Sequence, residues 1–353
     1  MNARIGSLCT GIGGLELGLT LAGLDTVPVF VSDIDPGANA WLEANMAHTP
    51  NLGNFTELDE LPEVDILTAG FPCQPVSTAG LRAGIKDDRW LFDDITRLVG
   101  RMGSRPVLFL ENVPGLLTAN GGHAMARVVH GLASISYGIT WGTYSAAAIG
   151  APHRRNRWWG LAWHASDFNQ EWSFGDSGSI RRSQASTRGS DSHAADADGA
   201  SRKTRFDSGH RSERLRPQPM GYPASTPDAA RFGRYAEAVH RWETILNRPA
   251  PNPTEDGRLN PPFVEWMMGY PAGWVTDTLT NRRQALHALG NAVVPQSAAA
   301  AHNTLSARFF SNGAQPPPQP TGFPSPLGGV GGVQTSSEQD MAYDQGGGRG
   351  MKL

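Results

Sequence analysis

Short apolar runs alternate with amphipathic segments along the first 163 residues. Continuous apolar runs indicate buried strands, and apolar residues that recur every three or four positions indicate helices. The predicted strands are residues 4–8, 26–32, 64–70, 106–113, 138–146 and 157–163. The predicted helices are residues 14–23, 35–46, 89–102 and 124–135. Strands that alternate with helices are typical of βαβ units around a mostly parallel sheet.

This pattern stops at about residue 165 and returns only partly. Residues 165–222 are rich in Ser, Gly, Asp and Arg and have almost no aliphatic residues, which predicts an extended loop without a core of its own. Helices are predicted again at 228–246 and in one or two segments after residue 281. From Asn312 the chain is a Pro/Gly-rich tail that we expect to be disordered.

Composition and charge exclude a membrane-spanning or disulfide-rich protein but do not indicate a function. The net charge of −3 and a pI near 6.4 give no overall attraction to nucleic acid or membranes, so any surface for a polyanion must be local. No apolar run is long enough to span a membrane, and no secretory signal precedes the first strand. Cys9 and Cys73 do not form a disulfide framework, and the cytoplasm is the expected compartment.

A glycine-rich turn follows the first predicted strand. In SLCTGIGGLELG, Gly11, Gly13 and Gly14 allow a tight turn that brings N–H groups and a helix N-terminus close to a ligand. A dinucleotide fingerprint requires another glycine where this chain has Glu16, which disfavours a nicotinamide cofactor. Asp33 ends the second strand and is a suitable acceptor for ribose hydroxyls. These residues leave open both a nucleoside site and a purely structural turn.

Two chemically active side chains are expected at the carboxyl ends of strands, and two arginines at the start of another strand. Cys73 lies on the loop GFPCQPVS, where a thiol is accessible, although a free cysteine is usually an inert buried side chain. Arg155 and Arg157, in APHRRNRWW, alternate and therefore point to one face of a strand. Glu111 ends an apolar strand and is a candidate acid or base. The alternatives are a surface arginine pair and an ordinary acid at a strand end.

Taken in order, several stretches resemble the DNA (cytosine-5) methyltransferase family: SLCTGIGGLELG, GFPCQPVS, ENV, APHRRNRW, LNPPFVEWMMGYPAGW and ALGNAVVPQ. The resemblance covers residues 4–163 and about 258–305, and all of these stretches in this order are specific. It implies a doubly wound, mostly parallel α/β sheet of the Rossmann-like methyltransferase type, with a smaller irregular target-recognition lobe. It also implies methyl transfer from S-adenosyl-L-methionine to C5 of a flipped-out cytosine.

The resemblance gives each candidate catalytic residue a role. Cys73 is expected to add to C6 as a thiolate and make the ring enamine-like. Glu111 is expected to hydrogen-bond the N3 edge and support its protonation. Arg155 and Arg157 match the family's basic pair, expected to orient Glu111, hold the base carbonyl and favour the thiolate. Asn112 is expected to hold the loop that carries the cysteine.

The resemblance also implies a cofactor site and no metal. Asp33 is expected to bind the ribose, Ile34 to pack on the adenine, and Asn291 to approach the cofactor from the C-terminal helix region. The implied set is Gly11, Gly13, Gly14, Asp33, Ile34, Asn54, Pro72 and Asn291.

Three residues depart from the usual family pattern. Asn54 replaces an Asp that accepts from the adenine amino group, but its carbonyl oxygen can still accept. Cys9 stands where many members carry a bulky aromatic residue, and His153 replaces a common Gln. None of these changes removes the central chemistry.

The resemblance predicts a catalytic domain at 1–163, a target-recognition lobe at 164–284, a helix at 285–310 that completes the catalytic domain, and a tail at 311–353. Between residues 181 and 216 there are nine Arg or Lys against five Asp or Glu. These cations are candidate phosphate or base contacts, or the stretch is a solvated linker.

The expected partner is double-stranded DNA, together with a cognate restriction endonuclease if the role is restriction-modification. A monomer without membrane contact is expected. Three alternatives stay open: an RNA (tRNA) methyltransferase with the same chemistry, a catalytically silent DNA-binding module, and a nicotinamide oxidoreductase. The recognised DNA sequence, and the choice between restriction protection and phage self-protection, do not follow from these residues.

Overall fold

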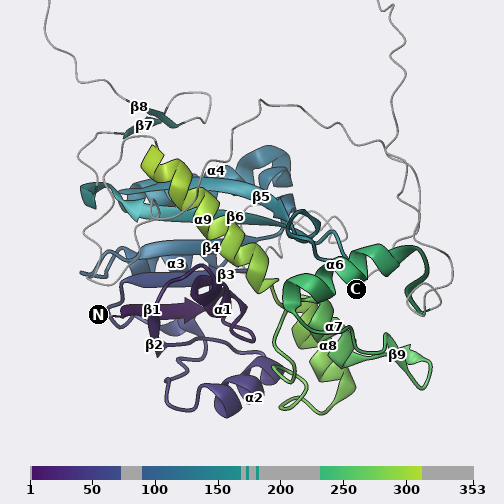
Figure 1. Ribbon diagram of the computed structural model, residues 1–353. Coiled ribbons are helices and arrows are strands. Elements are labelled where there is room, and N and C mark those ends of the chain that lie inside the picture. Colours follow the sequence, from purple (N-terminus) through teal and green to yellow (C-terminus); the bar gives the residue numbers. More distant parts are fainter. Residues whose placement is uncertain (1, 73–89, 168–171, 175–179, 183–230, 312–353) are drawn as a thin grey trace, which may run out of the picture.

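A mostly parallel sheet forms the centre of the larger half of the molecule (Figure 1). The computed structural model describes residues 2–72, 90–167, 172–174, 180–182 and 231–311. Within these ranges the main sheet has six strands in the order β2-β1-β3-β4-β6-β5. They are β1 (Ala3–Leu8), β2 (Thr26–Phe30), β3 (Ile66–Gly70), β4 (Val107–Asn112), β5 (Tyr137–Ser145) and β6 (Asn156–His164).

The directions of the strands confirm the predicted fold class. The pairs β1–β2, β1–β3 and β3–β4 are parallel, whereas β6 is antiparallel to both β4 and β5. Cys73, residues 183–216 of the basic stretch and the tail from residue 312 lie outside the described residues. Within the described ranges, no helix combines the length and apolar character needed to cross a membrane.

Helices cover both faces of the sheet because its central strands are apolar on both sides. On β4, Leu108 and Leu110 pack in one core with α3 (Phe92–Val99) and α4 (His123–Ser134). Phe109, between them, packs in a second core with α1 (Gly14–Leu21) and α9 (Pro295–Ser311). Side chains that alternate between two apolar cores are the period-2 pattern of a strand buried on both faces.

The N-terminus of α2 (Pro36–Asn45) forms as its sequence predicts. Asp35 Oδ1 accepts hydrogen bonds from the backbone N–H groups of Gly37 and Ala38, each at 2.9 Å, and Pro36 occupies the first helical position. An acidic N-cap followed by proline is a typical helix start.

The C-terminal helix α9 crosses α1 at close range. At Gly18, an added Cβ would lie 2.4 Å from the Cβ of Ala298 and 3.0 Å from the carbonyl oxygen of Pro295. Only a glycine allows this approach, so Gly18 and Ala298, which are 280 positions apart in sequence (298 − 18), lie in one layer on the sheet.

We expect Gly18→Ala to lower the free energy of unfolding by about 1–3 kcal/mol, because the new methyl group overpacks the α1–α9 contact. Urea denaturation monitored by circular dichroism measures this change. Gly138→Ala on the edge strand β5 is the matched control, because nothing lies within 4 Å of its added Cβ. Equal stabilities of the two variants would contradict the close contact.

A third apolar cluster lies beside α2 and is built mainly from the elements between residues 236 and 291. They are α6 (Ala236–Leu246), α7 (Pro261–Met267), α8 (Arg282–Asn291) and the short hairpin of β9 (Thr254–Glu255) and β10 (Arg258–Leu259). This cluster includes the fully buried Trp242, Trp266 and Tyr270, and it extends to Ile12 in the glycine turn and Trp41 on α2. The glycine turn therefore lies against the C-terminal half of the chain.

The prediction of a continuous extended loop at 165–222 is wrong in one place. Residues Trp172–Phe174 (β7) and Ile180–Arg182 (β8) pair as short antiparallel strands. Each strand is only three residues long but contains an aromatic or β-branched residue, the types that favour strands.

Candidate active site

The candidate residues follow strands whose carboxyl ends meet at one edge of the sheet. The glycine turn follows β1, Asp33 follows β2, Pro72 follows β3, and Glu111 lies at the end of β4. Gly70, the last residue of β3, pairs in register with Glu111. Open α/β sheets bind their ligands at this edge.

Glu111 is a buried carboxylate with a cationic partner. Its Oε1 lies 2.8 Å from Nε of Arg157, and the two side chains are 11% and 19% exposed. Burial raises the pKa of Glu111, although the charges of Arg157 and Arg155 act to lower it. The result is a carboxyl group that holds a proton more readily than an ordinary glutamate does, at the edge where a ligand is expected.

Arg155 makes contacts that differ from those of Arg157. Its Nη2 donates to the carbonyl oxygen of Gly290 at 2.8 Å and to that of Ala292. These carbonyls flank Asn291, so Arg155 fixes the junction between α8 and α9. Of the two arginines, Arg157 therefore orients Glu111 by a direct contact, whereas Arg155 acts on Glu111 through its charge.

The residues on either side of the segment that contains Cys73 lie together. Phe71 packs against Phe92 and Trp90, with ring centroids 5.0 and 6.4 Å apart. Asn112 Nδ2 donates to the carbonyl oxygen of Phe71 at 2.9 Å. Asn112 thus holds the residue two positions before Cys73 against the end of β4, next to Glu111.

The glycine turn is shaped by its own backbone and by Asp33. Gly11 and Gly13 have φ angles of +59° and +70°, in the left-handed region that favours glycine. Asp33 Oδ2 accepts from the Gly11 N–H at 2.7 Å, and its Oδ1 accepts from the Asp35 N–H at 2.8 Å. An added Cβ on Gly14 would lie 2.3 Å from Oη of Tyr270, so the turn has no room for a side chain there.

Ile34 and Pro72 follow β2 and β3 at the same edge of the sheet, and Asn291 ends α8. Ile34, which follows Asp33, is 69% exposed. Pro72 and Asn291 are also exposed, and nothing lies within 4 Å of an added Cβ on Gly11. An open glycine turn, a ribose-type acceptor and an exposed apolar side chain fit a nucleoside cofactor.

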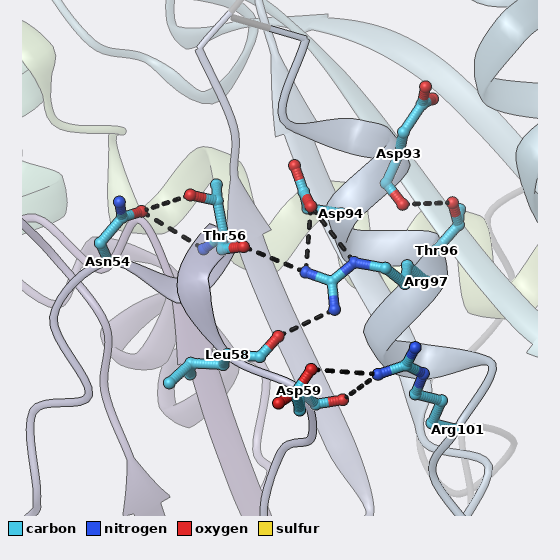
Figure 2. Close-up of polar contacts among 9 residues, drawn as sticks. All are labelled: Asn54, Thr56, Leu58, Asp59, Asp93, Asp94, Thr96, Arg97 and Arg101. Atoms are coloured by element: carbon cyan, nitrogen blue, oxygen red, sulfur yellow. Dashed lines mark hydrogen bonds and ion pairs between the residues drawn. The ribbon is translucent and has the colours of Figure 1, made fainter. Parts of the chain in front are cut away.

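Asn54 is held in one orientation by its neighbours (Figure 2). Its Oδ1 accepts from the backbone N–H and the hydroxyl of Thr56, at 3.3 and 2.9 Å, and its Nδ2 donates to Glu57 at 2.6 Å. Because a backbone N–H can only donate and a carboxylate accepts, these partners fix which end of the amide is oxygen.

Cys9 and His153, the other two departures from the family pattern, do not supply reactive groups. Burial and the charge of Asp33 raise the pKa of the Cys9 thiol to about 12, so it stays protonated. Burial lowers the pKa of His153 to about 4, and its Nε2 lies 3.0 Å from the carbonyl oxygen of Met267. Of the two cysteines in the chain, Cys73 is therefore the candidate nucleophile.

Trp274, in the stretch LNPPFVEWMMGYPAGW, contacts the glycine turn. Trp274 Nε1 donates to the carbonyl oxygen of Ile12 at 2.8 Å, and Trp41 Nε1 donates to the carbonyl oxygen of Trp274 at 2.5 Å. The buried Glu265 holds the backbone around Trp274 by accepting from Gly273, Val275 and Thr276 N–H groups. The sequence signal, a Gly- and aromatic-rich stretch between helices, does not reveal this contact.

A family model and curated relatives match this chain. The model of C-5 cytosine-specific DNA methylases matches residues 3–307. The chain is 36% identical over 158 residues to the Type II methyltransferase M2.BsuMI of Bacillus subtilis (strain 168), covering 44% of this chain and 40% of that protein. It is 35% identical over 159 residues to the Type II methyltransferase M.MspI of Moraxella sp, covering 44% and 37%. The matched part thus spans less than half the length of these relatives.

Solved structures with low identity share the fold. The DNMT2 of Spodoptera frugiperda, in a mutant form, matches with a TM-score of 0.52 and 18% identity, covering 86% of this chain and 100% of that one. A putative DNA modification methyltransferase from an E. coli prophage matches with a TM-score of 0.52 and 16% identity, covering 87% and 100%. The match of the family model along residues 3–307 shows that the chain belongs to the C-5 cytosine-specific DNA methylase family.

Proposed function

We propose that the protein is a DNA (cytosine-5-)-methyltransferase that modifies a flipped-out cytosine in a specific duplex sequence, through a covalent bond between Cys73 and C6. The observation that carries this proposal is the buried Glu111–Arg157 pair, which lies beside the backbone leading into Cys73. A carboxyl group of raised pKa, together with a thiol two residues beyond Phe71 in sequence, is the pair of groups that activation of a cytosine ring requires.

The cofactor proposed for this site is S-adenosyl-L-methionine. When bound, it supplies the electrophilic methyl group that C5 of the cytosine receives. Asp33 would accept from the ribose hydroxyls, since each carboxylate oxygen keeps a lone pair beyond its backbone contact. Ile34 would pack on the adenine, and Asn54 Oδ1 would accept from its amino group in place of the rotatable Thr56 hydroxyl. Gly11, Gly13, Gly14, Pro72 and Asn291 would line the rest of the site.

The residues of the chain perform the activation and release of the ring. The Cys73 thiolate forms a bond to C6, and Glu111 gives a proton to N3, so that the ring electrons are available at C5. After C5 carries the methyl group, its proton passes to solvent water, the electrons of the C5–H bond form the C5–C6 double bond, the C6–S bond breaks to release the thiolate, and N3 returns its proton to Glu111. Arg157 holds Glu111 in place during both proton transfers.

The different contacts of the two arginines predict different kinetic effects. We expect Arg155→Lys to raise the KM for S-adenosylmethionine about tenfold, because lysine loses one of the two bonds that hold the carbonyls beside Asn291. Arg157→Lys should instead lower kcat, because it removes the Nε donor from Glu111. Steady-state kinetics with each substrate varied in turn measures both effects. Identical profiles for the two variants would contradict the division of roles.

Bisulfite sequencing of duplex DNA incubated with the protein and S-adenosylmethionine tests the proposed function. Methylcytosine is expected in one short sequence context, and none in a reaction without the cofactor. The same incubation with tRNA, read by methyl incorporation, tests the RNA alternative. Incorporation into RNA alone would overturn the DNA assignment, and incorporation into neither polymer would overturn the activity.

The proposed partner is double-stranded DNA, bound by a monomer in the cytoplasm. The two matched relatives are named Type II methyltransferases, and we propose for this chain a role in restriction-modification, with a cognate endonuclease as the second partner. The basic residues between 181 and 216 are the proposed DNA contacts of the recognition lobe.

A further inference from the structure

The loop that carries Asn54, here called the Asn54 loop (residues 52–58), is attached to helix α3 by one arginine (Figure 2). Arg97 Nη1 donates to the carbonyl oxygen of Leu58 at 2.8 Å, and its Nη2 donates to that of Thr56 at 3.2 Å. The guanidinium is itself oriented by Asp94, whose Oδ1 accepts from Nε and Nη2 at 3.3 and 3.0 Å. A planar group that donates to three oxygens in this way defines their relative positions.

The Asn54 loop has separate attachments at its two ends. At the start, Ser32 Oγ donates to the carbonyl oxygen of Gly53 at 2.6 Å, next to Asp33. In the middle, Phe55 is buried in the core with 4% exposure. At the end, the polar contacts to α3 come from Arg97. Asn54 therefore lies between a fixed point near the ribose-type acid and a fixed point on α3.

Helix α3 also contacts the catalytic side of the site. Phe92, its first residue, packs on Phe71 with ring centroids 5.0 Å apart, and Phe71 is held by Asn112 on β4. A continuous set of contacts thus runs from the strand end with Glu111, through α3, to the Asn54 loop. Arg97 is the last member of this set and touches neither Glu111 nor the glycine turn in any described contact.

We propose that Arg97 is a positioning residue for the cofactor, fixing the Asn54 loop on α3 so that the carbonyl oxygen of Asn54 faces the adenine amino group. This inference rests on the proposed S-adenosylmethionine site. The restraint has a particular use here, because Asn54 is a neutral acceptor whose oxygen already accepts from Thr56. A neutral amide oxygen binds an amino group more weakly than a carboxylate does. The affinity for the adenine therefore depends more strongly on the position of the Asn54 oxygen.

The variant Arg97→Lys in the full-length protein tests this proposal. Lysine keeps the charge but cannot bridge both carbonyls and Asp94. Isothermal titration with S-adenosylhomocysteine should show affinity lower by about tenfold, the effect of one lost charge-assisted hydrogen bond. The KM for S-adenosylmethionine should rise equally, while kcat and the KM for DNA stay within about twofold.

A second ligand separates positioning from general weakening of the fold. S-inosylhomocysteine carries a carbonyl group where S-adenosylhomocysteine carries the adenine amino group. The wild-type protein should bind the adenosyl compound more tightly than the inosyl compound. In Arg97→Lys the ratio of the two affinities should fall toward one, because the inosyl compound has no amino group to donate to Asn54. A general loss of structure would weaken both ligands alike and keep the ratio.

Arg101→Lys is the matched control. Arg101 lies one turn further along the chain, and its Nη1 donates to the carbonyl oxygen of Asp59 at 2.7 Å, beyond the Asn54 loop. The affinity of the Arg101→Lys variant for S-adenosylhomocysteine should stay within about twofold of the wild-type affinity. Unchanged affinity or unchanged ligand preference in Arg97→Lys would overturn the inference about Arg97 alone. Failure of the wild type to bind S-adenosylhomocysteine would instead overturn the proposed cofactor site.

Discussion

Cys73→Ser is expected to abolish cytosine methylation while the protein still binds S-adenosylhomocysteine and duplex DNA. A serine hydroxyl is not ionised near neutral pH, and only an ionised nucleophile adds readily to C6 of the ring. Without that addition, C5 of cytosine is too weak a nucleophile to accept a methyl group. Bisulfite sequencing of DNA from cells that express the variant should therefore find no methylcytosine above background.

A covalent trap provides an independent measurement. With DNA that contains 5-fluorocytosine, the C5 position cannot lose a proton, so the bond between Cys73 and C6 persists and survives denaturing electrophoresis. Cys73→Ser should give no such complex. Cys9→Ser is the matched control and should still be trapped, because the pKa of the half-buried Cys9 thiol is raised to about 12 and this residue supplies no thiolate. Methylation by Cys73→Ser, or a methyl group on the exocyclic nitrogen, would contradict the covalent mechanism.

Local patterns in the sequence predict most of the sheet and the residues at its active edge. The apolar run at 106–110 predicts β4, and Glu111 follows it at the strand end, as observed. Asp35 and Pro36 predict the start of α2 because an N-cap depends only on neighbouring residues. Placing Asp33 beside the glycine turn needs only the rule that parallel strands end at one edge.

Contacts between distant segments are not predicted by the same patterns. Arg155 and Gly290 are 135 positions apart, and Trp274 and Ile12 are 262 apart. Nothing in the sequence near Arg155 distinguishes a donor to a carboxylate from a donor to backbone carbonyls, because its direction depends on where α8 ends. The same holds for Arg97, whose helical neighbours predict the ion pair with Asp94 but not the bonds to the Asn54 loop.

The second large effect is expected at Glu111. We expect Glu111→Gln to lower kcat by about 10²–10⁴, the usual contribution of general acid catalysis. Glutamine retains the size of the side chain and an oxygen that accepts from Arg157, but it has no proton to give to N3. The KM for S-adenosylmethionine should change by less than about twofold, because Glu111 is not among the proposed cofactor contacts. Single-turnover methyl transfer measures the chemical step.

The pH dependence of the rate distinguishes proton donation by Glu111 from a purely structural role. Burial raises the pKa of Glu111, so the wild-type rate should fall as the pH rises through that raised value and the proton is lost. Glu111→Gln should lack this decline at high pH. Glu16→Gln is the matched control: Glu16 is a second buried carboxyl group of raised pKa, but it accepts from Thr68 at 2.6 Å and is not assigned to the base. If Glu111→Gln keeps the decline at high pH, another group gives the proton to N3, and the buried pair with Arg157 serves only to shape the site.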